Sequence, residues 1–199
     1  MTRRLPLLAV AALLGCGGGG GGGDHPPRPL PRSAPSLGPT RHHRPPSLGA
    51  RAARGATIGG LRCAPVNRPR QGVHLELFAG RRVVLIPAGI GIAPPRARRG
   101  AAVEGGRCSY PIRTREPTGV LEVDTGGRTK TLGQLFAIWG QPLSPTRMAG
   151  FNGRPRAYVN GRRRQHDPRA IPLRRHAQIV LEVGGYVPPH RTYLFPPGL

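Results

Sequence analysis

Two arginines and two glutamates near the middle of the chain could perform chemistry together. Arg113 and Arg115 are separated by one residue, so on a β-strand their side chains would point to the same side. Two guanidiniums placed in this way could hold a carboxylate or a phosphate through paired hydrogen bonds. Alternatively, Arg113 pairs with Glu116 or Glu122, and the arginines then only balance the charge of the carboxylates. We favour this second interpretation.

The sequence contains no residue combination that is typical of a catalytic site. Ser109 and Ser144 lack the pattern of histidine and acid that activates a serine nucleophile. The polyglycine run at 17–23 is a linker and not a phosphate-binding loop. Glu116 and Glu122 remain as an acid–base pair, but two carboxylates in a basic domain are weak evidence for catalysis. We therefore expect a protein that is not an enzyme and that holds no cofactor.

The chain is strongly basic, with a formal net charge of +23 from 31 Lys and Arg against 8 Asp and Glu. This charge predicts attraction to anionic partners such as lipid headgroups or a cell-envelope polymer. However, the arginines are scattered along the chain and Lys130 is the sole lysine, which a compositional bias would also produce. We therefore expect no specific binding of nucleic acid.

The N-terminus has the features of an export signal. Arg3 and Arg4 precede an apolar run at 5–14 that is too short to span a bilayer. The run ends in Leu-Leu-Gly-Cys at 13–16, which resembles the lipobox of bacterial lipoproteins. The resemblance implies a signal peptide at 1–15, a lipid on Cys16, and an extracytoplasmic protein anchored to the cell membrane. The alternative is an ordinary cleaved signal followed by an incidental cysteine.

Composition divides the rest of the chain into a linker and a domain. The Gly, Pro, Arg and Ser residues of 16–55 cannot bury enough apolar surface to offset the entropy of ordering, which predicts a disordered tether. Residues 56–199 are expected to form one globular β-rich domain. If Cys16 carries lipid, Cys63 and Cys108 remain as an even pair, which in an exported protein predicts a structural disulfide.

Alternating and β-branched residues predict several strands in this domain. The expected segments are 73–77, 82–86, 119–124, 156–159 and 178–183. A turn is expected at 79–81 and a tight hairpin at Asn160-Gly161. A weak echo between 77–87 and 158–172 suggests two related β-rich halves.

One helix is predicted after these first strands. Thr131 and Gln134 have the spacing of a capping box, and Phe136 and Trp139 belong to one apolar face. Gly140 is expected to end the helix. The fold class is therefore α+β, mainly antiparallel β with one short helix.

Several motifs follow one another between about residue 61 and the C-terminus. They include Ile-Pro-Ala-Gly-Ile-Gly-Ile and Thr-Leu-Gly-Gln-Leu-Phe-Ala-Ile-Trp-Gly, and the last is Phe-Pro-Pro-Gly-Leu. The motifs lie at 74–75, 86–92, 131–140, 159–161, 167–173 and 195–199. In this order they resemble an uncharacterised family of secreted bacterial proteins and lipoproteins.

The resemblance implies a metal site in typical members, which carry His-x-His-Leu, Leu-His-Thr-His-Asp and a further histidine on the next strand. Clustered neutral imidazoles suit zinc or copper. In this chain Gly72, Arg113, Arg115 and Glu122 stand at four of these histidine positions, and His74 remains. Arginine does not ligate cations and repels them, so we expect the metal site to be lost.

Three functional hypotheses follow, in order of preference. The first is a non-enzymatic, membrane-anchored surface lipoprotein, a degenerate member of that family. The second is a copper- or zinc-binding extracytoplasmic protein, and the third is a binder of anionic ligands through Arg113 and Arg115. The candidate binding residues are His74, Arg113, Arg115, Glu116 and Glu122.

Overall fold

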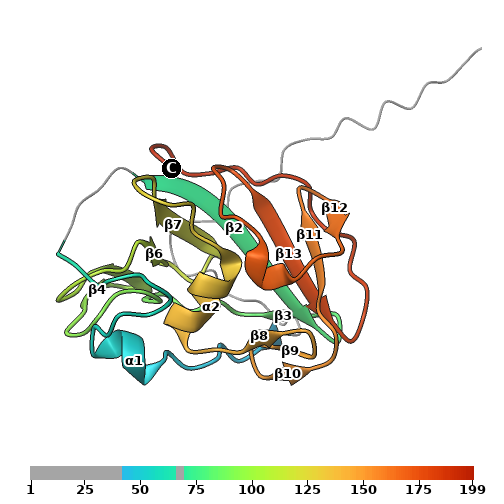
Figure 1. Cartoon of the computed structure of the whole chain (residues 1–199), viewed down its shortest axis with the longest axis horizontal. Helices are drawn as coiled ribbons and strands as arrows, with labels where there is room; N and C mark the ends of the chain where they lie inside the picture. The colour runs from blue at the N-terminus through green and yellow to red at the C-terminus, as the bar shows by residue number, and fades with distance from the viewer. Residues whose placement is uncertain (1–41, 66–69) are drawn as a thin grey trace, which may run out of the picture.

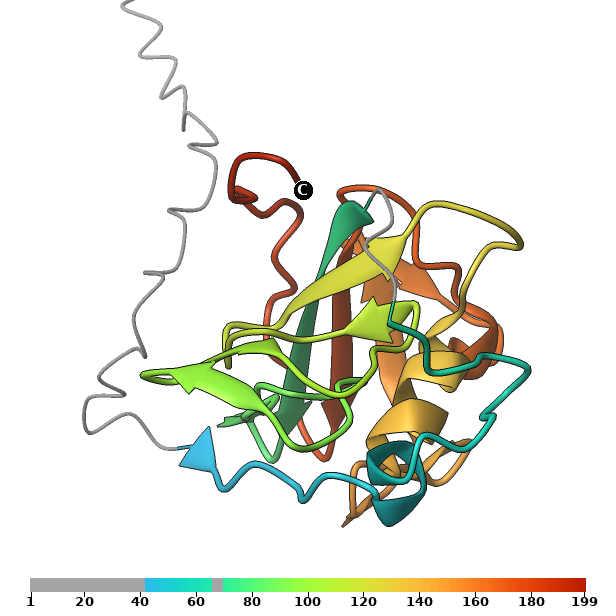
Figure 2. The same ribbon diagram turned by 90° about the vertical axis from the view of Figure 1, so that its left-hand side faces the viewer.

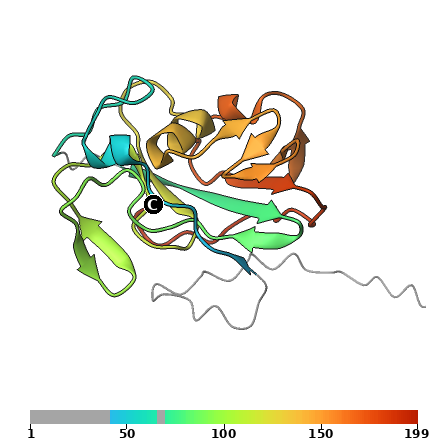
Figure 3. The same ribbon diagram turned by 90° about the horizontal axis from the view of Figure 1, so that it is seen from below.

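A computed structural model describes residues 42–65 and 70–199 of the chain. The main sheet has the strand order β1-β3-β2-β13-β11-β12, and β7 pairs with β2 and carries β6 at its outer side (Figure 1). Strands β10-β9-β8 form a small second sheet, and β4-β5 form a hairpin beside the main sheet (Figure 3). The strands are β1 (His42–His43), β2 (Arg70–Ala79), β3 (Arg82–Val84), β4 (Ala97–Arg99), β5 (Ala102–Gly105), β6 (Ile112–Arg113), β7 (Val120–Asp124), β8 (Leu143–Ser144), β9 (Arg147–Met148), β10 (Phe151–Asn152), β11 (Arg156–Val159), β12 (Arg162–Arg164) and β13 (Gln178–Val183).

Three helical elements accompany the strands: α1 (Ala50–Ala53), α2 (Leu132–Trp139) and the 3₁₀ helix η1 (Pro168–Ala170). Most strand pairs are antiparallel, while β2 and β13 pair in parallel at the centre of the main sheet. The predicted α+β class, mainly antiparallel β with one short helix, is confirmed. That helix is α2, which has 8 residues. None of the helices in the described part of the chain is long and apolar enough to cross a membrane.

Helix α2 forms where the capping box predicted it. The Thr131 side chain accepts a hydrogen bond from the Gln134 main-chain N–H, and the Gln134 side chain bonds back to the Thr131 main chain. Gly140 ends the helix in a left-handed conformation with φ 76°. Phe136 and Trp139 are buried, and they share one core with the face of β2 that carries Leu75. The helix therefore covers one face of the main sheet (Figure 2).

The opposite face of the main sheet is covered by the C-terminal segment, residues 184–199. Figure 2 shows this segment and α2 on the two sides of the sheet. Along β2, successive side chains alternate between these two sides, so that Leu75 points into the core and His74 points to the C-terminal segment. The candidate site lies on this second face.

The predicted boundary of the tether at residue 55 is wrong. Strand β1 pairs in parallel with β3, and α1 places Ala52 in the core with 8% exposure. The Gly49 N–H donates to the Trp139 carbonyl at 2.8 Å, and a Cβ on Gly49 would lie 2.8 Å from the Gly140 Cα. These contacts use main-chain groups and small residues, which composition does not reveal. Residues 16–41 of the predicted tether lie outside the described residues.

The two segments with related sequences both form hairpins. Strands β2 and β3 meet around Gly80, and β11 and β12 meet at Asn160-Gly161, as predicted. The two hairpins lie on opposite sides of β13 in one shared sheet. Their apolar residues Leu77 and Ala157 belong to the same core, so the echo does not divide the domain into separate halves.

Candidate functional site

Three neighbouring strands bring the predicted site positions together. In the register of β2 and β7, Gly72 lies opposite Glu122, and His74 lies opposite Val120. In the register of β6 and β7, Arg113 lies opposite the same Glu122. Directly paired residues share one face of a sheet, so Gly72, Glu122 and Arg113 form a row across the face beneath the C-terminal segment. His74 lies next to this row on the same face of β2, so four of the five positions at which the sequence resemblance implies histidines are close in space.

Glu122 is the centre of a network of ion pairs. Its carboxylate accepts from Arg70 at 2.6 Å, from Arg115 at 2.9 Å and from Arg113 at 3.1 Å. Arg113 also donates to Asp124 at 3.1 Å and to the main-chain oxygen of Tyr110 at 3.1 Å. The Arg113–Glu122 pair is one of the two pairings expected from the sequence.

The side chains of the network are buried to different extents. The Arg113 side chain is 3% exposed and that of Glu122 is 10% exposed, whereas Arg70 and Arg115 are 29% and 34% exposed. Burial raises the pKa of Glu122, but the charges of Arg115, Arg70 and Arg113 outweigh it and hold that pKa below its ordinary value. Glu122 is therefore ionised at neutral pH, and it has no proton to donate as a general acid.

His74 is enclosed by its neighbours. Its ring is 2% exposed and stacks on the ring of Tyr193, with 3.7 Å between centroids and 11° between planes. Nε2 lies 3.0 Å from the Thr118 carbonyl oxygen, and Nδ1 lies 2.7 Å from the side-chain amide of Gln178. Burial lowers the pKa of His74, and the hydrogen bond to Gln178 offsets this only in part. The imidazole is therefore neutral at physiological pH.

A neutral imidazole determines the hydrogen bonds around it. Because the Thr118 carbonyl can only accept, Nε2 of His74 carries the proton, and Nδ1 must accept from the Gln178 amide nitrogen. With the amide oxygen facing Nδ1, the buried Gln178 Nε2 would have no hydrogen-bond partner. A half-turn of the amide satisfies Nδ1 and needs almost no movement of heavy atoms. Both ring nitrogens are then used inside the protein.

The missing side chain of Gly72 is replaced in space by the C-terminal segment. A Cβ on Gly72 would lie 2.6 Å from the Phe195 ring and 3.1 Å from the Leu199 Cβ. The Phe195 ring in turn stacks on His176 with 4.7 Å between centroids. His176 Nε2 lies 2.8 Å from a main-chain oxygen of Leu199, which holds the end of the segment. The position expected for a metal ligand is thus occupied by an aromatic ring.

A pocket of about 320 Å³ remains between the ion-pair network and the C-terminal segment. Arg70, Arg115, Glu116 and Thr118 line one side, and Leu199 is among the residues on the other side. Glu116, the other possible ion-pair partner of Arg113 in the sequence, lines this pocket. Within residues 42–65 and 70–199, no three His, Cys, Asp or Glu side chains are grouped closely enough to hold a metal ion.

Sequence reasoning missed several participants of the site. Arg70 lies on the same alternating face of β2 as Gly72, so a longer first strand with period two would have included it. Asp124 lies within the expected strand 119–124, two residues after Glu122, but was not among the candidate binding residues. No local signal points to Gln178, because it meets His74 only through the parallel pairing of β13 with β2.

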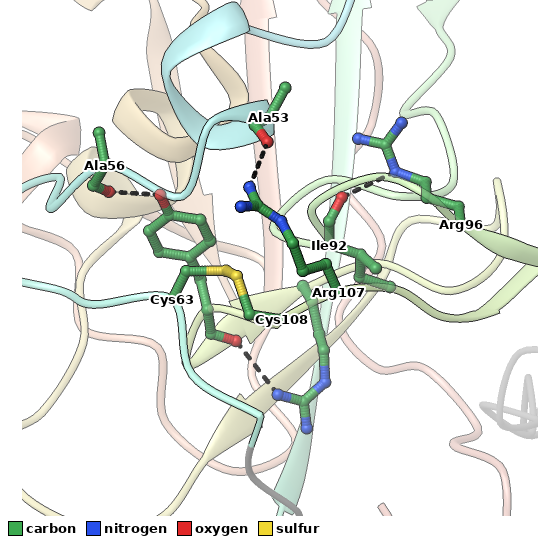
Figure 4. The surroundings of a disulfide bond; sticks show 9 residues. Ala53, Ala56, Cys63, Ile92, Arg96, Arg107 and Cys108 are labelled. Carbon is green, nitrogen blue, oxygen red and sulfur yellow. Dashed lines mark hydrogen bonds between the residues drawn. A yellow bond between two sulfur atoms is a disulfide. The ribbon is translucent and has the colours of Figure 1, made fainter.

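The predicted disulfide between Cys63 and Cys108 is present. It joins residues 45 positions apart, with 5.4 Å between the Cα atoms. Figure 4 shows the bond beside the Arg107 side chain, which donates to the Ala53 carbonyl at 3.2 Å. The bridge therefore lies where the segment after α1 packs on the domain. Cys16, the predicted lipidation site, lies outside the described residues.

Comparisons of the chain with protein families, with curated proteins and with solved structures find no match. Function is therefore inferred from the chemistry of the described residues and from the N-terminal motif.

Proposed function

We propose that this protein is a non-enzymatic lipoprotein, anchored on the extracytoplasmic side of a membrane by a lipid on Cys16. Its domain would be displayed as a binding or structural module after an N-terminal tether. The lipobox-like Leu-Leu-Gly-Cys at 13–16 supports the anchor. The disulfide between Cys63 and Cys108 is consistent with an oxidising compartment outside the cytoplasm.

One observation supports a non-catalytic role most directly. The carboxylate of Glu122 is held by three guanidiniums at 2.6, 2.9 and 3.1 Å, and its pKa is lowered by them although burial acts in the opposite direction. A carboxylate in this state neither stores a proton nor accepts one readily near neutral pH. The site that would carry chemistry in the related family is therefore used here to hold three strands together.

The two alternative functions receive less support. Copper or zinc binding would need a nitrogen of His74, and both nitrogens of that ring have protein partners beneath Tyr193. An anion at Arg113 and Arg115 would have to compete with Glu122, which already pairs with both guanidiniums. We therefore do not propose either function for these residues.

Fatty-acid labelling in a bacterial host tests the anchor. Cells producing the full chain are fed an alkyne fatty acid, and the label on the protein is detected after gel electrophoresis. We expect label on the wild type and on Cys63→Ser/Cys108→Ser, and none on Cys16→Ser. Label that persists in Cys16→Ser would overturn the proposed anchor.

Calorimetric titration tests the loss of the metal site. The oxidised full chain is titrated with Cu²⁺ and with Zn²⁺, beside His74→Ala. We expect no binding event that depends on His74. Tight one-to-one binding that disappears in His74→Ala would contradict the proposal and make the protein a metalloprotein.

A further inference from the structure

The region of the β11–β12 hairpin contains more arginines than its carboxylates can pair. Residues 147–199 contain two acidic side chains, Asp167 and Glu182. Asp167 is bound by Arg169 at 2.7 Å, and Glu182 is buried against Arg156 at 3.3 Å. The ion pairs of the described residues thus leave the other arginines of this region without a carboxylate. Edge strand β12 consists of three consecutive exposed arginines, 162–164 (Figure 1).

Three of these arginines contribute to the lining of one concave site. A pocket of about 420 Å³ is lined by Arg154, Arg163 and Arg164, together with His166. None of the three guanidiniums has an ion pair with a described carboxylate. Asp167 also lines the pocket, but its charge is balanced by Arg169, whose hydrogen bonds lower the pKa of Asp167.

The strand that carries Arg163 and Arg164 is held in the main sheet. Arg163 lies opposite Tyr158 and Arg164 lies opposite Ala157 in the antiparallel register of β12 with β11. Both partners are buried, with exposures of 8% for Tyr158 and 2% for Ala157, so the ladder that carries the arginines is part of the domain. The main chain that carries both arginines is therefore fixed.

We propose that the pocket formed by Arg154, Arg163, Arg164 and His166 binds a phosphate group. A guanidinium presents a planar set of N–H donors that matches two oxygens of a phosphate. Three unpaired guanidiniums can surround a multivalent tetrahedral anion, whereas a carboxylate offers two oxygens and one charge. The site lies beyond the proposed anchoring function and does not depend on it.

The positive surface continues past the pocket. A second pocket of about 610 Å³ shares Arg164 and His166 and adds Arg174 and Arg175. A phosphate attached to a larger polar group would therefore have further donors within reach. The phosphate could belong to a lipid headgroup or to a soluble phosphate compound, and the experiment separates these two sources.

The first test is titration of the full chain with inorganic phosphate at constant ionic strength, with acetate as the comparison anion. We expect one phosphate site and at least about tenfold weaker binding of acetate. Arg163→Gln/Arg164→Gln should weaken phosphate binding at least about tenfold, since it removes two charge-assisted contacts. Arg154→Gln removes a guanidinium outside the strand, and it should weaken binding in the same direction.

The matched control is Arg82→Gln/Arg98→Gln, which removes two exposed arginines from β3 and β4. Strand β3 lies far from β12 in the strand order of the main sheet. We expect phosphate affinity to be unchanged in this control. Equal weakening in both double variants would show a diffuse charge effect and overturn the site, as would the absence of phosphate binding or equal affinity for acetate.

Vesicles of phosphatidylglycerol in phosphatidylcholine identify the source of the phosphate. If co-sedimentation of the full chain with these vesicles falls in Arg163→Gln/Arg164→Gln and not in the control, the site takes a lipid headgroup. If inorganic phosphate binding depends on the site while vesicle binding falls equally in both variants, the site takes a soluble phosphate compound. Either result supports the phosphate site.

Discussion

Replacement of Glu122 by glutamine tests the ion-pair network beneath the C-terminal segment. The substitution keeps the size of the side chain and removes its charge. Removing one partner of a buried ion pair costs about 3–5 kcal/mol, because the remaining charge stays buried without compensation. Here Arg113, with its side chain 3% exposed, retains Asp124 at 3.1 Å, which places the cost at the lower end of that range.

The outer arginines add little to this cost. Arg70 and Arg115 are 29% and 34% exposed, so water can solvate them once Glu122 loses its charge. We therefore expect Glu122→Gln to lower the free energy of unfolding by about 3 kcal/mol. For a domain of this size, that loss corresponds to a fall in Tm of about 6–12 °C.

Denaturant unfolding and thermal melting followed by circular dichroism measure this loss. The control is Glu104→Gln, because the Glu104–Arg99 pair is exposed, with side-chain exposures of 47% and 84%. We expect the control to change the free energy of unfolding by less than about 0.5 kcal/mol. A loss below about 1 kcal/mol in Glu122→Gln would refute the reasoning, since the network would then not depend on a buried charge.

The pH dependence of stability provides a second readout of the same residue. The pKa of Glu122 is lower in the folded protein than its ordinary value of 4.5. Its contribution to stability is therefore fully present above pH 4.5 and is lost as the pH falls through the folded pKa. In Glu122→Gln, the acid-induced loss of stability should be smaller than in the wild type.

Three further predictions concern burial and covalent links. His74 has a pKa below its ordinary value of 6.5, so its contribution to stability is lost as the pH falls from 6.5 through the folded pKa. In denaturant unfolding at several pH values, the free energy of unfolding should decline less steeply with falling pH in His74→Gln than in the wild type. Gly72→Ala should lower the free energy of unfolding by about 1–3 kcal/mol, because the new Cβ would overpack against Phe195, whereas the control Gly126→Ala adds a Cβ with no atom within 4 Å. Similar Tm values for the two variants would contradict the contact between Phe195 and Gly72. Cys63→Ser/Cys108→Ser should lower the free energy of unfolding by about 4 kcal/mol, because the bridge joins residues 45 positions apart. An unchanged midpoint in denaturant titrations would show that the bridge does not stabilise the domain.

Several elements could be predicted from sequence because their signals are local. Helix α2 begins at a capping box and ends at a glycine, and both signals lie within a few residues of each other. Strands β11 and β13 have the predicted bounds, since alternation and β-branching are properties of neighbouring residues. The disulfide followed from the number of cysteines, once Cys16 was assigned to the lipid.

Other features could not be predicted because they depend on contacts across the sheet. The ordered segment at 42–55 is held by main-chain bonds to β3 and α2, and its composition is that of a linker. Phe195 fills the space at Gly72 from a position more than a hundred residues away in the chain. No periodicity within either segment encodes that contact.

The sequence by itself determined helix α2, strands β11 and β13, and the cysteine pair. It also showed a large excess of arginine, but not which arginines are neutralised. Only the tertiary structure decided that Arg113 and Arg115 pair with Glu122, while Arg163 and Arg164 line a pocket whose one carboxylate, Asp167, pairs with Arg169. The physical reason is that Coulomb energy depends on distance in space and on burial, and both are fixed by strand register and not by position in the chain.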